Sequence, residues 1–285
     1  MKKLTIGMCT FDDYEGVFFT IQSIRLHHKN VIDNINFIVV DNNPSSTHGN
    51  EVKNFVEKSV KGKYIPFTEY SSTSIRNLIF ENAETPYVLC VDCHILLENN
   101  SIERLIQFFD AGKDEGNLVQ GPLLWDDLKG VSTGFNSNWG AHMQGQWNFD
   151  ERYVNADSEP FEIYAQGLGL FGCRKDAWLG FNANFRGFGG EEIYLHDKYR
   201  RAGKKTLLLP FLGWNHRFVR VNGVPYTNTF NDRYRNYLIG HIELQKDANY
   251  LEDIFKDVLS EDTIENIKTD VIKLFKPVSC CGRSS

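Results

Sequence analysis

Short apolar runs alternate with helical patterns through residues 4–119, and this alternation most constrains the fold. The run 87–91, which is charge-free and follows Pro86, has the composition of a buried strand, and so does 36–41, which ends in an acidic residue. Apolar residues recur at helical spacing between the runs, in segments 16–28, 50–60, 74–82 and 101–111. Strands separated by helices of about ten residues indicate right-handed βαβ units and a parallel sheet.

Polar residues directly follow several of these strands. They are Thr10 and Phe11 after the first strand, Asp41 after the second, and Asp92-Cys93-His94 after the run 87–91. Because parallel strands carry their carboxyl ends to one rim, where α/β sheets bind ligands, we expect a single cleft there. Side chains two residues apart in extended backbone point the same way, so Asp92 and His94 would converge as divalent-metal ligands. The alternative is that Asp92 caps a turn and His94 is a surface residue.

Two later elements would reach the same rim. Gly189-Gly190-Glu191-Glu192 opens a helix, and Trp214-Asn215-His216 follows a strand. Acidic residues in a first helical turn also complement the helix dipole, which is the structural alternative to a catalytic role.

The segment from about 122 to 160 breaks the strand–helix rhythm. It holds Trp125, Trp139 and Trp147 among amide, glycine and acidic residues. Long loops in compact domains are usually functional or mobile, and exposed tryptophans beside amides are typical of sugar-binding surfaces. An irregular hairpin with its own small core is the alternative.

Composition excludes several classes of function. The net charge of −6 gives no general attraction to nucleic acid or an anionic membrane. No run approaches 18 apolar residues, so we expect no transmembrane helix. The six cysteines lack the spacing of a disulfide framework, and with no signal peptide we predict a reducing, cytoplasmic location. A basic run at 198–205 and a cluster (Arg217, Arg220, Arg233, Arg235) leave a nucleic-acid acceptor as a minor alternative.

Taken together, these motifs resemble GT-A fold, family 2-like glycosyltransferases over about residues 3–220. The resemblance rests on the opening strand 4–10, on 39–42 (Val-Val-Asp-Asn), on Ile75-Arg76-Asn77, on the DxH variant of a DxD motif at 92–94 and on 189–192. The DxH form with a later His216 also resembles polypeptide N-acetylgalactosaminyltransferases, in which DxH and a distal histidine bind manganese. The resemblance implies a Rossmann-like α/β fold with a mostly parallel central sheet flanked by helices.

It also implies a domain plan. Residues 1–220 would form the glycosyltransferase domain, with a nucleotide-binding half (1–121) and an acceptor half (122–220). Amphipathic helical segments within 250–276 indicate a C-terminal helical extension over 221–276, followed by a disordered tail at 277–285 that contains Cys280 and Cys281.

The implied reaction is metal-dependent transfer of a sugar from a nucleotide-diphosphate donor, with a UDP-sugar favoured, to an acceptor hydroxyl. Two phosphates that gain charge in the transition state need a cation, and Mn²⁺ or Mg²⁺ would supply it. The resemblance assigns the metal to Asp92, His94 and His216, and the nucleotide to Thr10, Phe11, Asp41, Arg76 and Asp92. A strand-end turn cap is the alternative for Asp41, and a solvated helix face is the alternative for Arg76.

By the same resemblance, Glu192 is the candidate base and Glu191 binds donor or acceptor hydroxyls. Retaining N-acetylgalactosaminyltransferases carry an amide at the position of Glu192, so the carboxylate here favours inversion over retention. The acceptor is a saccharide, a protein or another hydroxyl compound, with Trp125, Trp139 and Trp147 as candidate contacts.

Two other classes of protein remain open. Asp92, His94 and His216 also form the two-histidine, one-carboxylate set of a non-haem iron oxygenase, although that chemistry usually occurs in an all-β jelly roll. A non-catalytic sugar-binding module on the same fold is the second alternative, since fold does not guarantee activity.

Overall fold

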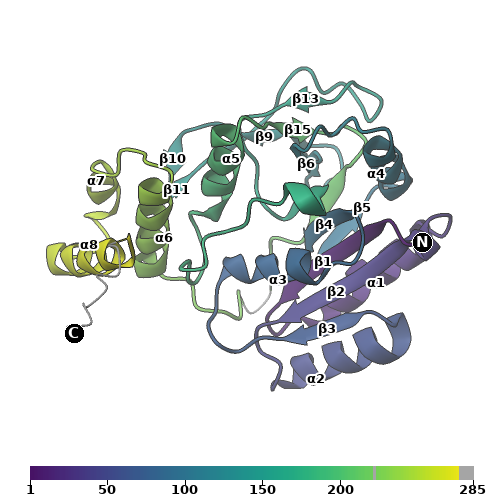
Figure 1. Cartoon of the computed structure of the whole chain (residues 1–285), viewed down its shortest axis with the longest axis horizontal. Helices are drawn as coiled ribbons and strands as arrows, with labels where there is room; N and C mark the ends of the chain where they lie inside the picture. The colour runs from purple at the N-terminus through teal and green to yellow at the C-terminus, as the bar shows by residue number, and fades with distance from the viewer. Residues whose placement is uncertain (221–222, 276–285) are drawn as a thin grey trace, which may run out of the picture.

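The computed structural model describes residues 1–220 and 223–275, and a central sheet organises them (Figure 1). Its strand order is β13-β15-β6-β14-β4-β1-β2-β3. The strands are β1 (Leu4–Thr10), β2 (Ile35–Asp41), β3 (Lys63–Pro66), β4 (Tyr87–Asp92), β6 (Leu118–Gln120), β13 (Phe161–Glu162), β14 (Leu170–Arg174) and β15 (Thr206–Leu208). Strands β3, β2, β1 and β4 run parallel, as do β6 and β15, whereas β13 and β14 are antiparallel to their neighbours. The predicted mostly parallel sheet flanked by helices is confirmed.

Helices cover both faces of this sheet, and several begin at a capping side chain. They are α1 (Tyr14–His27), α2 (Thr47–Asn54), α3 (Asn77–Asn82), α4 (Ser101–Asp110) and α5 (Glu191–Arg201). Asp13 caps α1 by accepting from the Gly16 N–H, and Ser46 caps α2 by accepting from the Gly49 N–H. Short helical turns are η1 (Ile32–Asn34), η2 (Phe55–Val60, continuous with α2), η3 (Thr73–Arg76) and η4 (Lys175–Ala177).

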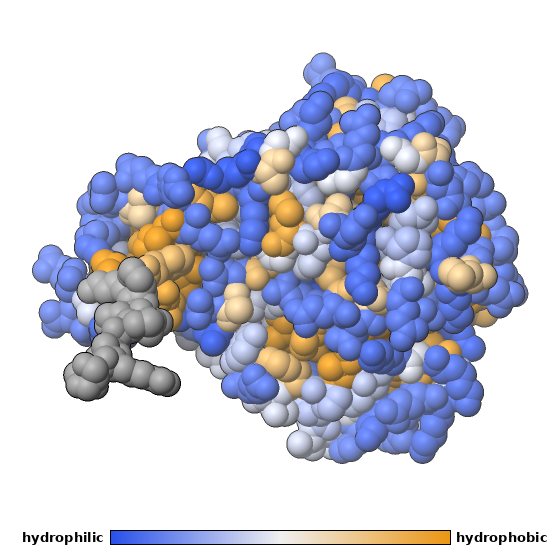
Figure 2. All heavy atoms as spheres, viewed as in Figure 1, coloured by the Kyte–Doolittle hydropathy of each residue, from blue (hydrophilic) through white to orange (hydrophobic). Residues whose placement is uncertain are grey.

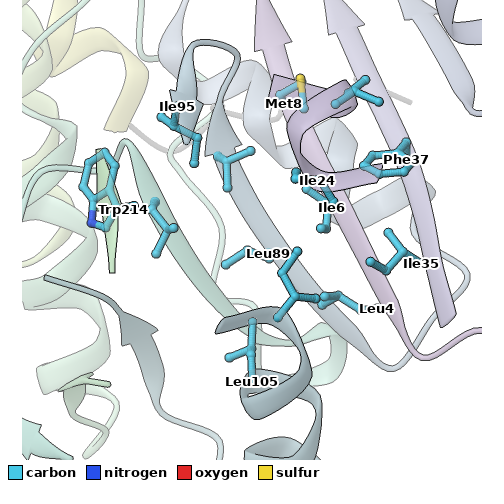
Figure 3. Close-up of a cluster of buried hydrophobic side chains, with 14 of the residues drawn as sticks. Leu4, Ile6, Met8, Ile24, Ile35, Phe37, Leu89, Ile95, Leu105 and Trp214 are labelled. Atoms are coloured by element: carbon cyan, nitrogen blue, oxygen red, sulfur yellow. The ribbon is translucent and has the colours of Figure 1, made fainter. Parts of the chain in front are cut away.

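Alternate residues of the central strands face two separate buried clusters. Leu4, Ile6 and Met8 of β1 pack with Leu89 of β4 and with apolar residues of α1, α2 and α4 (Figure 3). Val88 and Cys90 of β4 face the other side, toward apolar residues of α3, α5 and α6 (Phe230–Glu243). This two-sided burial explains why the parallel strands are continuously apolar in sequence.

A glycine in β1 sets how closely α3 approaches the sheet. A Cβ on Gly7 would lie 2.0 Å from Cγ2 of Ile79, far inside van der Waals contact. Ile79 is fully buried, so the isoleucine side chain takes the volume that a side chain at position 7 would need. The close approach therefore depends on glycine.

A second, smaller sheet brings distant residues to the ends of β1 and β4. It contains β5 (Ile95–Leu97), β16 (Trp214–His216), β7 (Leu123–Leu124) and β8 (Val131–Ser132) in that order. His216 pairs with Ile95 in this sheet and is thus set beside His94. The tryptophan-containing segment forms hairpin strands rather than an open loop: β9 (Gly134–Phe135) with β12 (Trp147–Asn148), and β10 (Trp139–Gly140) with β11 (Met143–Gln144).

The C-terminal helices α6, α7 (Leu251–Phe255) and α8 (Glu261–Phe275) lie at one end of the molecule (Figure 1). Tyr234, Tyr237 and Ile239 of α6 join the same buried cluster as β4, so these helices share the core of the sheet. The predicted tail at 277–285, with Cys280 and Cys281, lies outside the described residues, and the proposed division into halves stays a prediction.

The surface is largely hydrophilic on the face drawn in Figure 2, with scattered apolar side chains. Exposed apolar residues on α8 include Ile272, Leu274 and Phe275. Within the part of the chain that the structure describes, no helix has both the length and the apolar character needed to cross a bilayer. The cysteines described (Cys9, Cys90, Cys93, Cys173) are free thiols.

Candidate active site

A cleft of about 480 Å³ opens at the rim where β1 and β4 end. Most of the predicted site residues line it: Thr10, Phe11, Arg76, Asp92, His94, Trp147, Glu191, Glu192 and His216. Strand register explains this convergence, because Thr10 of β1 lies beside Asp41 of β2 and Cys9 lies beside Asp92 of β4. Asp41, Trp125 and Trp139 do not line the cleft.

The three predicted metal ligands come together at one point of the cleft. The Nε2 atoms of His94 and His216 lie 3.1 Å apart, and Nε2 of His216 lies 3.3 Å from Oδ2 of Asp92. Neighbouring ligands on an octahedral ion with bonds of about 2.1 Å are separated by about 3.0 Å, so this spacing fits a divalent cation. One carboxylate and two imidazoles suit Mn²⁺ or a related first-row ion and leave positions free for other ligands.

Asp92 is held as an anion. Its Oδ1 accepts from Nη2 of Arg76 at 2.9 Å. Burial alone would raise the pKa of Asp92, but the hydrogen bond from His216 and the charge of Arg76 outweigh burial and hold that pKa well below its usual range. The Nη1 atom of Arg76 is buried and has no hydrogen-bond partner among the described residues. The arginine therefore has a donor left for an anion in the cleft.

Glu191 and Glu192 lie in the first turn of α5, where the turn through Gly189 and Gly190 places them in the cleft wall. Both glycines have positive φ, 102° and 90°, which L-residues rarely adopt. Oε2 of Glu191 accepts from the Gly189 N–H at 2.8 Å. Burial raises the pKa of Glu191, and burial together with the neighbouring Glu191 charge raises the pKa of Glu192 to about 8.

The predicted nucleotide contacts divide into two groups. Thr10 and Phe11 line the cleft, where the Phe11 ring packs edge-on against Tyr226 at 6.3 Å between centroids. Asp41 instead is fully buried: its Oδ1 accepts from the Asn43 N–H at 2.9 Å and its Oδ2 from the Tyr64 hydroxyl at 2.8 Å. Its observed contacts are those of the strand-end turn cap, and it is the neighbouring Asn42 that lines the cleft.

The tryptophans also differ in position. Trp147 lines the cleft, and Trp125 packs behind it with ring centroids 5.9 Å apart. Trp139 packs against Tyr237 of α6 at 4.7 Å, so its indole serves the contact with the C-terminal helices.

Among the other cleft residues, Asp13 and Tyr226 were not predicted, and Arg217 and Arg220 were noted only as part of a basic cluster. Nη2 of Arg217 donates to both carboxylate oxygens of Asp13, at 2.8 and 2.7 Å. Nη2 of Arg220 lies 3.1 Å from Nε2 of His94. A signal was available for three of them, because Asp13 closely follows Thr10-Phe11 and both arginines closely follow His216.

The family model for "Glycosyl transferase family 2" matches residues 5–171, more than half of the chain. The chain belongs to glycosyl transferase family 2. This membership confirms the predicted family, and the α/β fold argues against the iron-oxygenase alternative, whose chemistry usually occurs in a jelly roll. A comparison with curated protein sequences gave no significant match.

Solved structures with the same fold include two members of known ligand content. GalNAc-T7, solved with UDP, GalNAc and Mn²⁺, superposes with a TM-score of 0.67 at 14% identity over 96% of this chain. TarS residues 1–349 from S. aureus, solved with UDP-GlcNAc, superposes with a TM-score of 0.60 at 12% identity over 95% of this chain. The match covers 58% of the GalNAc-T7 chain and 81% of the TarS chain. At these identities the likeness establishes the shared GT-A fold.

Proposed function

We propose that this family 2 protein is a metal-dependent glycosyltransferase that moves a sugar from a UDP-sugar to an acceptor hydroxyl. The ligand atoms of Asp92, His94 and His216 lie within 4.8 Å of one another, in the same cleft as Glu191 and Glu192, and this convergence carries the proposal. The ligands named for the GalNAc-T7 and TarS structures, UDP with Mn²⁺ and UDP-GlcNAc, support the choice of donor.

The residues around the proposed metal suit a departing diphosphate. A divalent cation held by Asp92, His94 and His216 would neutralise the charge that develops on the phosphates. The free Nη1 donor of Arg76 and the guanidinium of Arg220 lie in the same cleft and would donate to phosphate oxygens. Phe11 and Tyr226 offer aromatic surface for the base, and the Thr10 hydroxyl, buried without a partner among the described residues, offers a polar contact.

Glu192 is the proposed base for an inverting reaction. With the pKa of Glu192 raised to about 8, it binds and releases a proton near physiological pH, which is where a general base is most effective. It would accept the proton of the acceptor hydroxyl as that oxygen attacks the anomeric carbon. Glu191, fixed by the Gly189 N–H, would hold a substrate hydroxyl. The retaining alternative predicts the opposite anomer of the product, and proton NMR distinguishes the two anomers.

The rest of the cleft favours a neutral acceptor. Apolar and aromatic lining residues include Phe135, Met143, Trp147, Leu168 and Phe188. Among the described lining residues the arginines are Arg76, Arg217 and Arg220. Arg76 is paired with Asp92, and the other two lie within 3.9 Å of an Asp13 oxygen.

The basic run 198–205, which suggested a nucleic-acid acceptor, makes intramolecular contacts. Lys198 pairs with Glu243 at 2.9 Å, Arg200 pairs with Asp197, and Lys204 donates to the Glu115 carbonyl. We therefore propose a saccharide or a protein hydroxyl as the acceptor.

A thermal-shift screen tests the donor assignment. UDP should stabilise the protein when Mn²⁺ is present and much less in its absence, and GDP should do less than UDP. Incubation with UDP-sugars and hydroxyl acceptors, followed by mass spectrometry, then tests transfer. Binding of UDP without any transfer or donor hydrolysis would favour the sugar-binding module. Absence of both UDP binding and transfer would reject the proposed donor site.

A further inference from the structure

We propose that Asp13 is a positioning residue that fixes the tautomer of His94 and so directs Nε2 of His94 at the metal. The inference rests on the proposed metal-dependent function and deepens it. It adds to the site a carboxylate from the start of α1, 81 residues before His94 in sequence.

The contact between the two residues leaves one arrangement of protons. Oδ2 of Asp13 lies 3.0 Å from Nδ1 of His94, and both side chains are more than 90% buried. Both carboxylate oxygens of Asp13 also accept from Nη2 of Arg217, at 2.8 and 2.7 Å, so Asp13 faces His94 as an acceptor. A carboxylate only accepts, so Nδ1 of His94 must carry the hydrogen. A histidine that binds a metal does so as the neutral imidazole, so with the hydrogen on Nδ1 the lone pair is on Nε2.

The surroundings of Nε2 agree with that assignment. Nε2 faces the Nε2 atom of His216 at 3.1 Å, on the side where the metal ligands converge. The Nη2 atom of Arg220 lies 3.1 Å from Nε2 and 3.2 Å from Nδ1, so it does not distinguish the two nitrogens, and the Asp13 contact does. Carboxylates commonly hold metal-binding histidines in this way from outside the ligand set, and removing one costs about 10–100-fold in metal affinity.

Helix α1 holds Asp13 and the turn of His94 as one unit. Oδ1 of Asp13 accepts from the Gly16 N–H at 3.0 Å. The Thr20 hydroxyl donates to the Ile95 carbonyl at 2.9 Å and accepts from the Ile95 N–H at 3.0 Å. A Cβ on Gly16 would lie 2.7 Å from the Cys93 carbonyl, which shows how tightly the helix meets this turn. Helix α1 therefore fixes the position of Asp13 relative to His94.

Asp13 is poorly placed to be a metal ligand itself. Asp13, Cys93 and His94 do form a second cluster of possible ligand atoms. However, the Arg217 guanidinium contacts both oxygens of Asp13, and the Cys93 thiol lies 3.7 Å from Oδ2 of Asp13, where it is placed to donate. A cation there would compete with Arg217 for the same oxygens. A positioning role uses the contacts that Asp13 already makes.

The variant Asp13→Ser separates capping from positioning. Serine caps a helix as well as aspartate does, but its short side chain cannot reach Nδ1 of His94. We expect D13S to fold and to bind Mn²⁺ about 10–100-fold more weakly than wild type. Asp13→Asn keeps an acceptor oxygen and should lose less affinity than D13S. The control is Asp114→Asn, which removes a buried carboxylate paired with Arg174 outside the cleft and should leave Mn²⁺ affinity unchanged.

Two measurements give independent readouts. Electron paramagnetic resonance of free Mn²⁺ gives the affinity, and long-range ¹H–¹⁵N correlation of metal-free protein gives the tautomer of His94, expected as Nδ1–H in wild type and mixed in D13S. Equal Mn²⁺ affinity of D13S and wild type, or an Nε2–H tautomer in wild type, would overturn the inference. If wild type binds no Mn²⁺, the proposed function fails, and the tautomer still decides the role of Asp13. If D13S fails to fold, Asp13→Asn replaces it in both measurements, and an unchanged tautomer and affinity in D13N and in Asp13→Ala would overturn the inference.

Discussion

We propose two separable roles for Asp92, one in stability and one in metal binding, and Asp92→Asn tests both. In the metal-free protein the variant leaves the Arg76 guanidinium without its carboxylate. Breaking a buried ion pair costs about 3–5 kcal/mol. The side chains of Arg76 and Asp92 are 10% and 25% exposed, so solvent offsets part of this cost, and we expect a loss of roughly 1–3 kcal/mol.

The second role appears only with ligands present. A ligand at one hundred times its dissociation constant stabilises the folded state by about 2.7 kcal/mol. At roughly 2–4 °C per kcal/mol for a chain of this size, wild type should gain about 5–10 °C in Tm from UDP with Mn²⁺. Because Asn cannot supply an anionic ligand, D92N should lose most of that gain.

Differential scanning fluorimetry with and without UDP, Mn²⁺ and both measures the two effects together. Asp114→Asn is the matched control: it breaks a buried Arg–carboxylate pair with Arg174, 3.1 Å long, and should lower the metal-free Tm while keeping the ligand-dependent gain. His216→Ala should keep most of the metal-free Tm, because it spares the Arg76–Asp92 pair, and should lose the ligand-dependent gain. A D92N protein that keeps the full Mn²⁺-dependent gain would refute the assignment of Asp92.

Three other substitutions test other parts of the molecule. Glu192→Gln should abolish transfer and raise Tm near pH 8. The pKa of Glu192 is raised from 4.5 to about 8 in the folded protein, so wild type loses stability as pH rises through this range, whereas glutamine stays neutral. A Tm–pH curve identical to that of wild type would contradict the raised pKa. Gly7→Ala should lower the free energy of unfolding by about 1–3 kcal/mol, measured with denaturant, because its Cβ would lie 2.0 Å from Ile79. The double variant with Ile79→Ala should lose less than the sum of the two single losses. Trp147→Ala should raise the KM for acceptor more than the KM for donor, whereas Trp139→Phe, outside the cleft lining, should change neither; equal kinetic effects would argue against an acceptor contact.

The rim of the sheet was predictable because its signal is local. Buried parallel strands are continuous apolar runs, and the residue that ends each run lies at one edge whatever the rest of the chain does. Asp92 and His94 could therefore be placed together from their spacing alone. The same reasoning could not orient Asp41, because its side chain is bound by Tyr64 of the next strand.

Contacts between distant segments account for what sequence reasoning missed. Asp13 was not singled out in the sequence, and one of its partners, Arg217, is 204 residues away. Trp139 looked like its neighbours in the same loop, yet Tyr237 of α6 draws it out of the cleft lining. Local spacing predicts which residues reach the rim, whereas packing between elements decides which of them face the ligand.

The acidic residues of the cleft differ in their partners, and this difference indicates distinct roles for them in the proposed reaction. Asp92 and Asp13 contact arginine or histidine, and the pKa of each is held well below its usual range. Glu192 forms no salt bridge within residues 1–220 and 223–275, lies beside Glu191, and has its pKa raised to about 8. Groups whose pKa values are driven apart in one site commonly take distinct roles in catalysis. Permanent anions at the proposed metal site and one proton-exchanging carboxylate in α5 would suit the proposed transfer from a diphosphate to a hydroxyl. Glu192→Gln, assayed at a pH where wild type is ionised, should remove the second function and keep the first.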